Sequence, residues 1–449
     1  MHEIEITRIS SDEFADAMRT ASASAIRLDS TGPVSEWSRW SYIADSPRLL
    51  LRCDSSTKVA TLSDASGVMQ RWDDPLNALQ WLESMCKNDP QDGPRLKGGW
   101  IGWISYDFGR IFETIPTIAR DDLGLPWFEF QYHDRVWALD RLNGQCYRVS
   151  RRRSVSHPIK LPAPVLPGVQ ASVCMSSNIS PSQYERAVKR ALDYIRAGDI
   201  FQVNLSQRFT APLRESPAQI YARLQNQSGS SYGAYFPSSD YALLSNSPEL
   251  FLRVIVDPPS RKRRIITRPI KGTRPRAPGM EAELRDSTKD QAELNMIVDL
   301  ERNDLGRVCD IGSVRVTHPR DIEAHPTVYH GVATIEGTLR ADVTFVDLLR
   351  ATFPGGSVTG APKIRAMQII DQLEPTRRGP YCGAIGFVST DGHIEFNLAI
   401  RTMVATRGQI HIPVGGGIVA DSVPADEYEE TLVKARAMFA AIGIDTIRQ

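Results

Sequence analysis

Residues 200–209 alternate between apolar and polar side chains with a period of two. The apolar set is Phe201, Val203, Leu205 and Phe209, and the polar set is Gln202, Asn204, Ser206 and Arg208. A period of two predicts a β-strand, because successive side chains of a strand point to opposite faces. We expect the polar face to be exposed to solvent unless the strand lines a cavity.

A helical period precedes this strand, and a second one lies nearer the N-terminus. Ser180 suits the N-cap position, Pro181 the first helical position and Gly198 the end of the helix. The apolar face between them consists of Tyr184, Val188, Ala191, Leu192 and Ile195. Residues 75–85 repeat the same spacing, so we expect a helix in each place.

Several further strands are indicated. Residues 241–256 predict two strands joined by a tight turn at 245–248, and Glu249 follows the turn between two apolar runs. Residues 49–51 and 98–107 also predict strands, the second with glycines that permit close sheet packing. Strands alternate with a few long helices in the rest of the chain, without internal repeats.

The chain is expected to divide at residues 151–167. Three successive arginines are followed there by a stretch rich in serine and proline. This composition predicts a linker. We therefore expect an N-terminal region of mixed strands and helices at 1–165 and a C-terminal catalytic region at 175–449.

Composition narrows the class of protein. The 449 residues include 53 basic and 53 acidic side chains, so no charge excess points to nucleic acid or to an anionic membrane. No apolar run reaches the roughly 20 residues needed to span a bilayer, and the N-terminus has no secretory signal. The six cysteines are scattered without a Cys-x-x-Cys pair. We expect a soluble, cytoplasmic protein with reduced thiols.

The stretch at 268–276 has the strongest chemical signature. Two prolines bracket Lys271, which is followed at once by Gly272, and an apolar extended run leads in. We expect Lys271 at the end of a strand, because proline favours extended backbone before it. Arginines nearby would favour a neutral amine, which is a nucleophile. A surface lysine in a basic turn fits the same residues.

Two predicted helices carry paired acids at helical spacing. One carries Asp290 and Glu293, and the other, which begins after Pro424, carries Glu427 and Glu430. In a single helix such acids equally suit a solvated face with surface ion pairs. Two such helices favour a Mg²⁺ site, since this ion prefers one or two carboxylates together with water and an anionic substrate.

The glycine-rich segment at 353–363 does not have the spacing of a phosphate-binding loop. Ala361 stands where that motif requires lysine. Small residues would still allow a substrate to approach the backbone. The helix predicted to begin near Pro362 would favour an anion at its N-terminus.

Several motifs together resemble the chorismate-utilising enzymes. Pro-Ile-Lys-Gly-Thr at 269–273 is similar to the motif of the aminodeoxychorismate synthases, whereas anthranilate synthases usually have alanine at the position of Lys271. Residues 293–307, 353–363 and 415–430 resemble further family segments. The resemblance implies an α+β fold in which helices surround a two-sheet β-sandwich.

The resemblance also implies the ligands of the site. Mg²⁺ would be bound by Glu293 and Glu430, with Asp290 and Glu427 as outer helpers. Chorismate would be held by Gly272, Thr273, His330, Thr359, Tyr381, Arg401, Gly415, Gly416, Gly417 and Lys434.

Two of these residues can also be judged by their own chemistry. The guanidinium of Arg401 suits a substrate carboxylate. His330, considered without the resemblance, suits a buried histidine of the core.

The activity implied by the resemblance is amination of chorismate to 4-amino-4-deoxychorismate, in the para-aminobenzoate and folate pathway. Lys271 would attack ring carbon 2 while the hydroxyl on carbon 4 leaves, and Glu249 would protonate that hydroxyl. Burial between apolar strands should raise the pKa of Glu249 enough to keep it protonated. Ammonia would then add at carbon 4 and expel the lysine.

Two absences bear on the alternatives. Relatives that add water to chorismate have a lysine base at the position of Gln202, so isochorismate formation lacks its base here. Lys271 argues against anthranilate formation, and intact catalytic positions argue against a non-catalytic chorismate-binding subunit. The chain has no Gly-x-Cys-x-Gly glutaminase motif. Ammonia is therefore expected from a glutamine amidotransferase partner or from solution.

Overall fold

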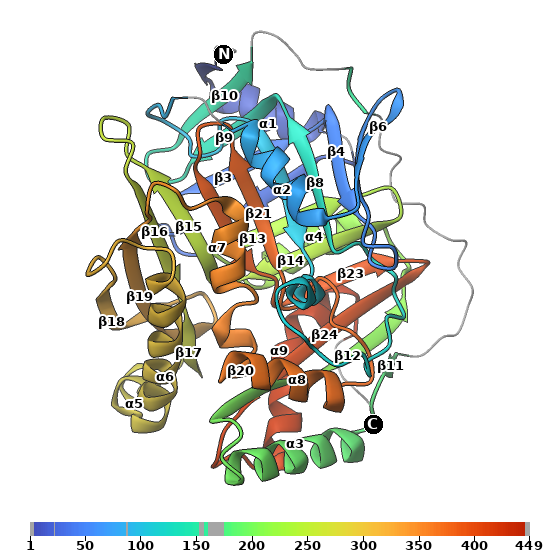
Figure 1. The fold of residues 1–449 in the computed structure, drawn as a ribbon, viewed down its shortest axis with the longest axis vertical. Helices are drawn as coiled ribbons and strands as arrows, with labels where there is room; N and C mark the ends of the chain where they lie inside the picture. The colour runs from blue at the N-terminus through green and yellow to red at the C-terminus, as the bar shows by residue number, and fades with distance from the viewer. Residues whose placement is uncertain (1–3, 22, 87–88, 152–156, 160–174, 445–449) are drawn as a thin grey trace.

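The computed structural model describes residues 4–21, 23–86, 89–151, 157–159 and 175–444 (Figure 1). Its backbone forms two large antiparallel sheets of 12 strands each, with helices packed around them. The predicted α+β fold with a two-sheet sandwich is confirmed.

The first sheet runs from β10 at the top of the view in Figure 1 to β12 and β11 at its lower right. In spatial order it contains β1 (Ile4–Ile9), β10 (Gln145–Arg151), β9 (Arg135–Asp140), β3 (Trp40–Ala44), β2 (Ile26–Asp29), β13 (Tyr232–Pro237), β14 (Tyr241–Ser247), β23 (Thr402–Thr406), β24 (Gln409–Ile418), β12 (Gln202–Pro212) and β11 (Ser176–Ser177), with β20 (Gly360–Ala361) paired to β12.

The second sheet packs against the first. In spatial order it contains β17 (Ile270–Pro275), β19 (Val328–Thr338), β16 (Arg263–Arg268), β15 (Leu250–Val256), β22 (Ile394–Leu398), β21 (Ala384–Ser389), β7 (Gly99–Ile104), β8 (Phe128–His133), β4 (Leu49–Cys53), β5 (Ala60–Asp64) and β6 (Gly67–Trp72), with β18 (Arg315–Ala324) paired to β19.

The helices are α1 (Ser11–Thr20), α2 (Pro75–Ser84), α3 (Pro181–Arg196), α4 (Pro217–Gln227), α5 (Met280–Asp286), α6 (Thr288–Gly306), α7 (Phe345–Thr352), α8 (Lys363–Leu373) and α9 (Pro424–Ala441), with short 3₁₀ turns η1 (Tyr106–Ile111) and η2 (Gly356–Val358). Ser180 caps α3 in a capping box with Gln183, as the sequence predicts. The predicted helix at 75–85 is α2, capped by Asp74.

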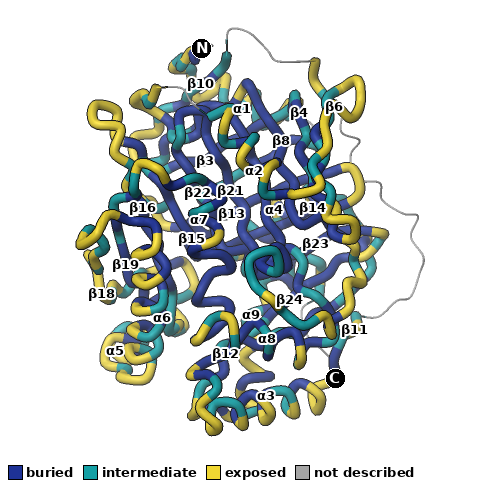
Figure 2. The backbone as a smooth tube through the Cα atoms, in the orientation of Figure 1, coloured by how far each residue is buried: buried dark blue, intermediate teal, exposed yellow. Residues whose placement is uncertain are grey.

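The inner faces of the two sheets share a buried core. Trp103 of β7 packs edge-on to Tyr241 of β14, and its Nε1 donates a hydrogen bond of 2.9 Å to the tyrosine hydroxyl. Leu243 and Phe236 from the first sheet and Phe387 from the second belong to the same cluster. Figure 2 shows this central layer as the most deeply buried part of the molecule. Burial of this apolar surface stabilises the sandwich.

Helices cover the outer faces. Phe439 of α9 packs edge-on to Phe209 of β12, and Leu224 of α4 joins the same cluster on the first sheet. Phe345 of α7 stacks on Phe396 of β22, so α7 covers the second sheet. The helices with predicted acidic pairs lie next to different sheets, because α6 packs against β17 and β19 of the second sheet and α9 packs against β24 of the first.

Two of the places where the chain passes from one sheet to the other are neighbours. Glu249 lies between β14 of the first sheet and β15 of the second, and Arg401 lies between β22 of the second and β23 of the first. The crossovers are joined by hydrogen bonds from Leu398 N to Glu249 O at 3.1 Å and from Asn246 N to Arg401 O at 3.1 Å. The predicted tight turn at 245–248 is therefore wrong. Residues 245–247 continue β14, and the next strand enters the other sheet.

The predicted strand at 200–209 exists as β12, with two differences. Phe201 lies before the strand and its side chain is exposed, although the sequence pattern assigns it to the buried face. Gln202, Asn204 and Arg208 of the polar face are buried, and Ser206 is half-buried. This face is covered because α8 packs on β12 and Glu374, just after α8, accepts hydrogen bonds from Ser206.

Both predicted regions, 1–165 and 175–449, contribute strands to each sheet. Their division into domains stays a prediction, and most of the predicted linker at 151–167 lies outside the described residues. None of the described helices is long and apolar enough to cross a membrane. The described cysteines, Cys53, Cys86, Cys146, Cys309 and Cys382, form no disulfide.

Candidate active site

The candidate active site lies where β17 of the second sheet approaches β24 of the first. A Cβ atom placed on Gly417 would lie 3.3 Å from Nζ of Lys271 and 3.1 Å from Nε2 of Gln202. Glycine at position 417 therefore leaves the space that the amine and the amide occupy. The fold brings these three distant positions together.

Lys271 stands in a β-bulge. Lys271 and Gly272 together lie opposite Gly331 of β19, where the register of the two strands shifts. Gly272 has φ +80°, and a Cβ atom on it would lie 2.9 Å from Cγ of Asp290, so only glycine fits there. Lys271 is the second residue of β17, which begins after Pro269, rather than the end of a strand. A bulge re-aims a side chain, and here it points the lysine at Gly417.

The amine of Lys271 has no hydrogen-bond or ion-pair partner among the residues that the structure describes. Burial lowers the pKa of Lys271 below its ordinary value, and the positive charge of Lys434 acts in the same direction. The carboxylates of Glu293 and Glu249 oppose this effect. An amine with a lowered pKa and no partner is suited to nucleophilic attack.

The predicted cause of this lowered pKa was different. The sequence suggests nearby arginines, but none is among the main causes for Lys271. Arg268 is ion-paired with Glu323, and Arg274 is ion-paired with Asp290 at 2.9 Å. Their charges are offset by these partners, so desolvation has the larger effect.

Glu249 lies at the crossover beside Lys271 and is 4% exposed. Ser357 Oγ donates a hydrogen bond of 2.6 Å to its Oε1, and the backbone N–H of Ile270 donates to the same oxygen at 3.4 Å. Burial raises the pKa of Glu249 to about 7, against the hydrogen bond from Ser357 and the charge of Lys271. A carboxyl group with this pKa can donate a proton near neutral pH.

The predicted metal-binding acids come from α6 and α9 and influence one another. Burial raises the pKa of Glu293 against the positive charge of Lys271, and the negative charges of Asp290 and Glu430 add to the rise. Burial likewise raises the pKa of Glu427, and Glu430 adds to this rise. The acids of two distant helices are therefore close enough to repel one another.

The side chains of α9 converge on Gly416. A Cβ atom there would lie 3.3 Å from Oε2 of Glu427, 3.6 Å from Nζ of Lys434 and 3.7 Å from Oε1 of Glu430. Lys434 Nζ lies 2.6 Å from Glu430 Oε1 and donates to Gly415 O at 3.1 Å. Burial would raise the pKa of Glu430, but the charge of Lys434 lowers it overall.

Binding of Mg²⁺ by Glu293 and Glu430 stays a prediction. In the described residues no group of three or more His, Cys, Asp or Glu side chains is placed to hold a metal ion. Two carboxylates that repel one another, Glu293 and Glu430, nevertheless match the ligand set of an ion that completes its shell with water and substrate oxygens. Asp290 is held by Arg274, and Glu427 accepts a hydrogen bond from Ser422 at 2.5 Å. Both suit an outer role.

Arg401 and His330 offer unpaired groups to a ligand. Arg401 has φ +49°, a conformation rare outside glycine, and its guanidinium makes no ion pair among the described residues. Nδ1 of His330 lies 2.9 Å from Thr273 Oγ1, whereas its buried Nε2 has no partner. Burial lowers the pKa of His330 well below its ordinary value, and Arg401 adds to this. His330 is therefore not the satisfied core histidine that the residue alone suggests.

Two residues predicted to contact the substrate, Thr359 and Tyr381, contact other groups of the protein. Thr359 is buried, and its Oγ1 donates to Gly355 O at 2.9 Å. The ring of Tyr381 lies 6.0 Å from the guanidinium of Arg378, and burial raises the pKa of Tyr381 well above its ordinary value. Their contact with chorismate stays a prediction.

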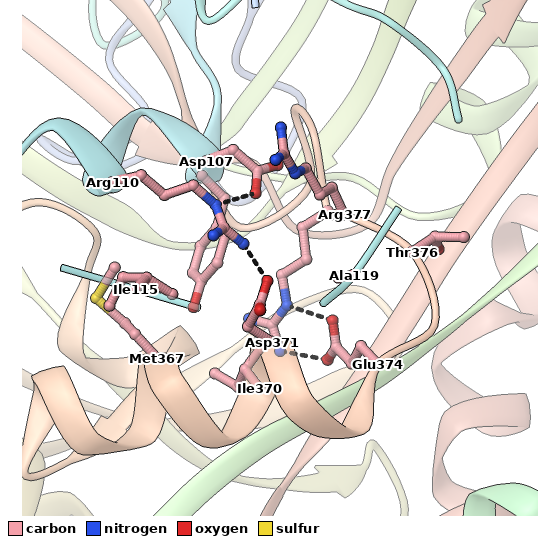
Figure 3. Close-up of a pocket in the computed structure, with 12 residues that line it drawn as sticks. Asp107, Arg110, Ile115, Ala119, Met367, Ile370, Asp371, Glu374, Thr376 and Arg377 are labelled. Carbon is pink, nitrogen blue, oxygen red and sulfur yellow. Dashed lines mark hydrogen bonds and ion pairs between the residues drawn. The ribbon is translucent and has the colours of Figure 1, made fainter. Parts of the chain in front are cut away.

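A small cavity lies between η1 and α8 (Figure 3). Figure 3 shows Arg110 between Asp107 and Asp371, with which it forms ion pairs. The cavity has a volume of about 10 Å³, which is far below that of a ligand pocket. None of the predicted site residues lines it.

One arginine of this cavity supports the site, and the sequence analysis does not identify it. The buried guanidinium of Arg378 pairs with Glu374 at 2.6 Å and donates to Val358 O at 2.9 Å and to Asn204 O at 2.7 Å. It thereby ties η2 to β12. Ser357 was also not assigned, although it stands in the glycine-rich segment and donates to the candidate acid.

The comparisons with known proteins agree with this geometry. The chain matches the family described as chorismate binding enzyme over residues 40–440. It is 42% identical over 389 residues to anthranilate synthase component 1 of Thermus thermophilus, covering 82% of each chain. It is 39% identical over 408 residues to aminodeoxychorismate synthase component 1 of Klebsiella aerogenes, covering 88% of each chain.

A solved structure supports the same relation. The crystal structure of anthranilate synthase component I from Streptococcus pneumoniae TIGR4 is similar with a TM-score of 0.76 and 30% identity, covering 90% of this chain and 93% of that chain. This chain belongs to the chorismate binding enzyme family and is a chorismate-utilising enzyme. Its relatives have two different names, so the particular reaction has to be argued from the residues.

Proposed function

We propose that this chain is the aminating component of an aminodeoxychorismate synthase, which converts chorismate and ammonia to 4-amino-4-deoxychorismate. The observation that carries the proposal is the unpaired amine of Lys271, placed beside Gly417 and next to the acid Glu249. The similarity to the aminodeoxychorismate synthase component 1 of Klebsiella aerogenes supports it.

Some of the predicted site residues would bind chorismate through charge or hydrogen bonds, and others would leave space for it. Glu293 and Glu430 would hold Mg²⁺, which would supply positive charge to offset the ring carboxylate of chorismate during attack. Arg401 pairs with a substrate carboxylate, and Nε2 of His330 hydrogen-bonds the substrate. The glycines at 415–417 have no side chains, so they leave space for the ring of chorismate.

The first step uses Lys271 as nucleophile and Glu249 as acid. The neutral amine of Lys271 attacks ring carbon 2, the ring π electrons shift, and the bond between carbon 4 and its hydroxyl breaks. Glu249 donates its proton to this hydroxyl, which leaves as water, and becomes a carboxylate. The pKa of about 7 for Glu249 suits this donation at neutral pH.

The second step restores both residues. Ammonia attacks carbon 4, the π electrons shift back, and the bond between carbon 2 and Lys271 breaks. The carboxylate of Glu249 takes a proton from the new ammonium group, so that the acid and the free amine are regenerated. The sum is chorismate plus ammonia giving 4-amino-4-deoxychorismate plus water. Gln202 has no acid–base function, so water is not activated at its position.

Anthranilate formation is the second candidate, because the 42% identical relative from Thermus thermophilus is an anthranilate synthase component 1. The two reactions differ in their products, since anthranilate formation also releases pyruvate. Incubation of the purified chain with chorismate, Mg²⁺ and ammonium, followed by mass spectrometry, tests the proposal. We expect 4-amino-4-deoxychorismate without pyruvate. Anthranilate as the main product would contradict it.

The source of ammonia gives a further prediction. The chain lacks the glutaminase motif, and its relatives are named as component 1 of their synthases. We therefore expect the isolated chain to use ammonium salts and to be inactive with glutamine until a glutamine amidotransferase subunit is added. Rates measured with each nitrogen source, with and without that subunit, check this. Turnover with glutamine by the isolated chain would show a different ammonia source.

A further inference from the structure

A second buried carboxyl group lies behind the candidate acid. Glu301 is in α6, about two turns beyond Glu293, and is 8% exposed. It faces a bulge between β15 and β16, where Phe251 and Leu252 both lie opposite Thr267. No role assigned above uses this carboxyl group.

The two close contacts of the Thr267 hydroxyl limit where the proton between Thr267 and Glu301 can lie. Thr267 Oγ1 is 2.7 Å from the carbonyl oxygen of Phe251 and 3.0 Å from Oε2 of Glu301. A hydroxyl group has one proton, and a backbone carbonyl can only accept. If Thr267 donates to Phe251, the contact with Glu301 is a hydrogen bond only when the carboxyl group is protonated and donates.

This cluster is connected to both reacting residues. Phe251 lies two residues after Glu249, and Thr267 lies four residues before Lys271. On its other side Glu301 packs on η2, since a Cβ atom on Gly356 would lie 3.7 Å from its Cγ. The next residue of η2, Ser357, donates to Glu249.

We propose that Glu301 keeps a proton and donates it to Thr267, and that this hydrogen bond holds the bulge in the shape that positions Glu249 and Lys271. Glu301 is a positioning residue, because nothing places it in contact with substrate. The inference rests on the proposed roles of Glu249 and Lys271, whereas the protonation of Glu301 can be tested without them.

The charges around Glu301 support a neutral carboxyl group. Burial raises its pKa to about 8, and the negative charges of Glu249 and Asp304 act in the same direction, whereas the contact with Thr267 and the charge of Lys363 act against it. When Glu249 has given up its proton, a neutral Glu301 prevents two carboxylates from facing each other in the interior.

Thermal unfolding tests the proton directly. The pKa of Glu301 is higher in the folded state than its ordinary value, so its contribution to stability is largest at acid pH and is lost as pH rises through about 8. Glu301→Gln replaces the protonated acid with a neutral donor. We expect equal Tm values at about pH 5, and a Tm about 2 °C or more above the native value at about pH 8.5.

Asp304→Asn is the matched control in the same helix. Asp304 lies 2.5 Å from Nζ of Lys363, so its loss leaves a cation unpaired. This variant should lower Tm at both pH values. A Tm difference between Glu301→Gln and native protein that does not change with pH would overturn the proton assignment.

Kinetics test the positioning role. Glu301→Leu should lower kcat for chorismate consumption by about tenfold or more, and Glu301→Gln should restore most of it because the amide still donates to Thr267. At high pH, log kcat/KM should fall with a slope of about −2 in the native enzyme, where Glu249 and Glu301 both lose protons, and about −1 in Glu301→Gln.

The two readouts separate the possible failures. Equal slopes, or full activity of Glu301→Leu, would overturn the positioning role. If the Tm difference depends on pH but the product is anthranilate, the protonation of Glu301 is supported and the proposed function is rejected.

Discussion

Lys271→Ala is expected to lower the rate of 4-amino-4-deoxychorismate formation by on the order of 10³-fold or more. The side chain is the one unpaired amine that the described structure places beside Gly417, and no other nucleophile can occupy its position in the bulge. The loss should appear in kcat, because alanine leaves the proposed metal and carboxylate contacts in place. Product formation with saturating ammonium, followed by mass spectrometry, is the measurement.

Lys262→Ala is the matched control, because Lys262 is exposed at the tip of the hairpin between β15 and β16. It should keep the native rate.

In Lys271→Ala, excess ammonia attacking ring carbon 2 directly would give products of the anthranilate path. The native enzyme without ammonia should accumulate an adduct of Lys271 with a chorismate-derived ring, detectable by peptide mass spectrometry. A native rate in Lys271→Ala and no adduct would make Lys271 a structural residue.

Local signals in the sequence were sufficient to predict many of the individual elements. Ser180 and Pro181 start α3 as expected, and the predicted acidic helices are α6 and α9. Such signals act within a few residues, through capping and the periodicity of apolar side chains. They are therefore readable without the rest of the fold.

The sequence did not show which sheet each strand joins. The polar residues before Glu249 look like a turn, but they are buried strand residues on the way from one sheet to the other. The same holds at Arg401, whose positive φ arises at the second crossover. Pairing between strands far apart in the chain is set by tertiary packing, which a local pattern does not contain.

The sequence was sufficient to predict which residue types carry the chemistry of the site. It was not sufficient to predict what surrounds each of them in the fold. The raised pKa of Glu249 was expected from its apolar flanks and is confirmed. The lowered pKa of Lys271 was expected from arginines, and burial is instead the main cause. Supporting residues such as Arg378 and Glu301 have no local signature, because their partners come from other elements.

Glu293→Gln and Glu430→Gln are each expected to lower turnover by on the order of 10²-fold or more, even at saturating Mg²⁺. An amide is a poor ligand for a hard cation, and each carboxylate comes from a different helix, so neither can replace the other. Glu427→Gln should have a smaller effect, about tenfold to a hundredfold in metal affinity, as expected for an outer helper.

Glu429→Gln is the matched control, since Glu429 lies in the same helix with an exposed side chain. Calorimetric titration with Mg²⁺ in the presence of chorismate separates a lost ligand from a misfolded protein. We expect weak or absent binding in Glu293→Gln and Glu430→Gln and native binding in Glu429→Gln. Because Lys434 is paired with Glu430, the Glu430→Gln variant also frees a cation beside Lys271. Its turnover should therefore stay low even where Mg²⁺ binding is partly recovered. Native turnover in Glu293→Gln at ordinary Mg²⁺ would exclude this pair of carboxylates as the metal site.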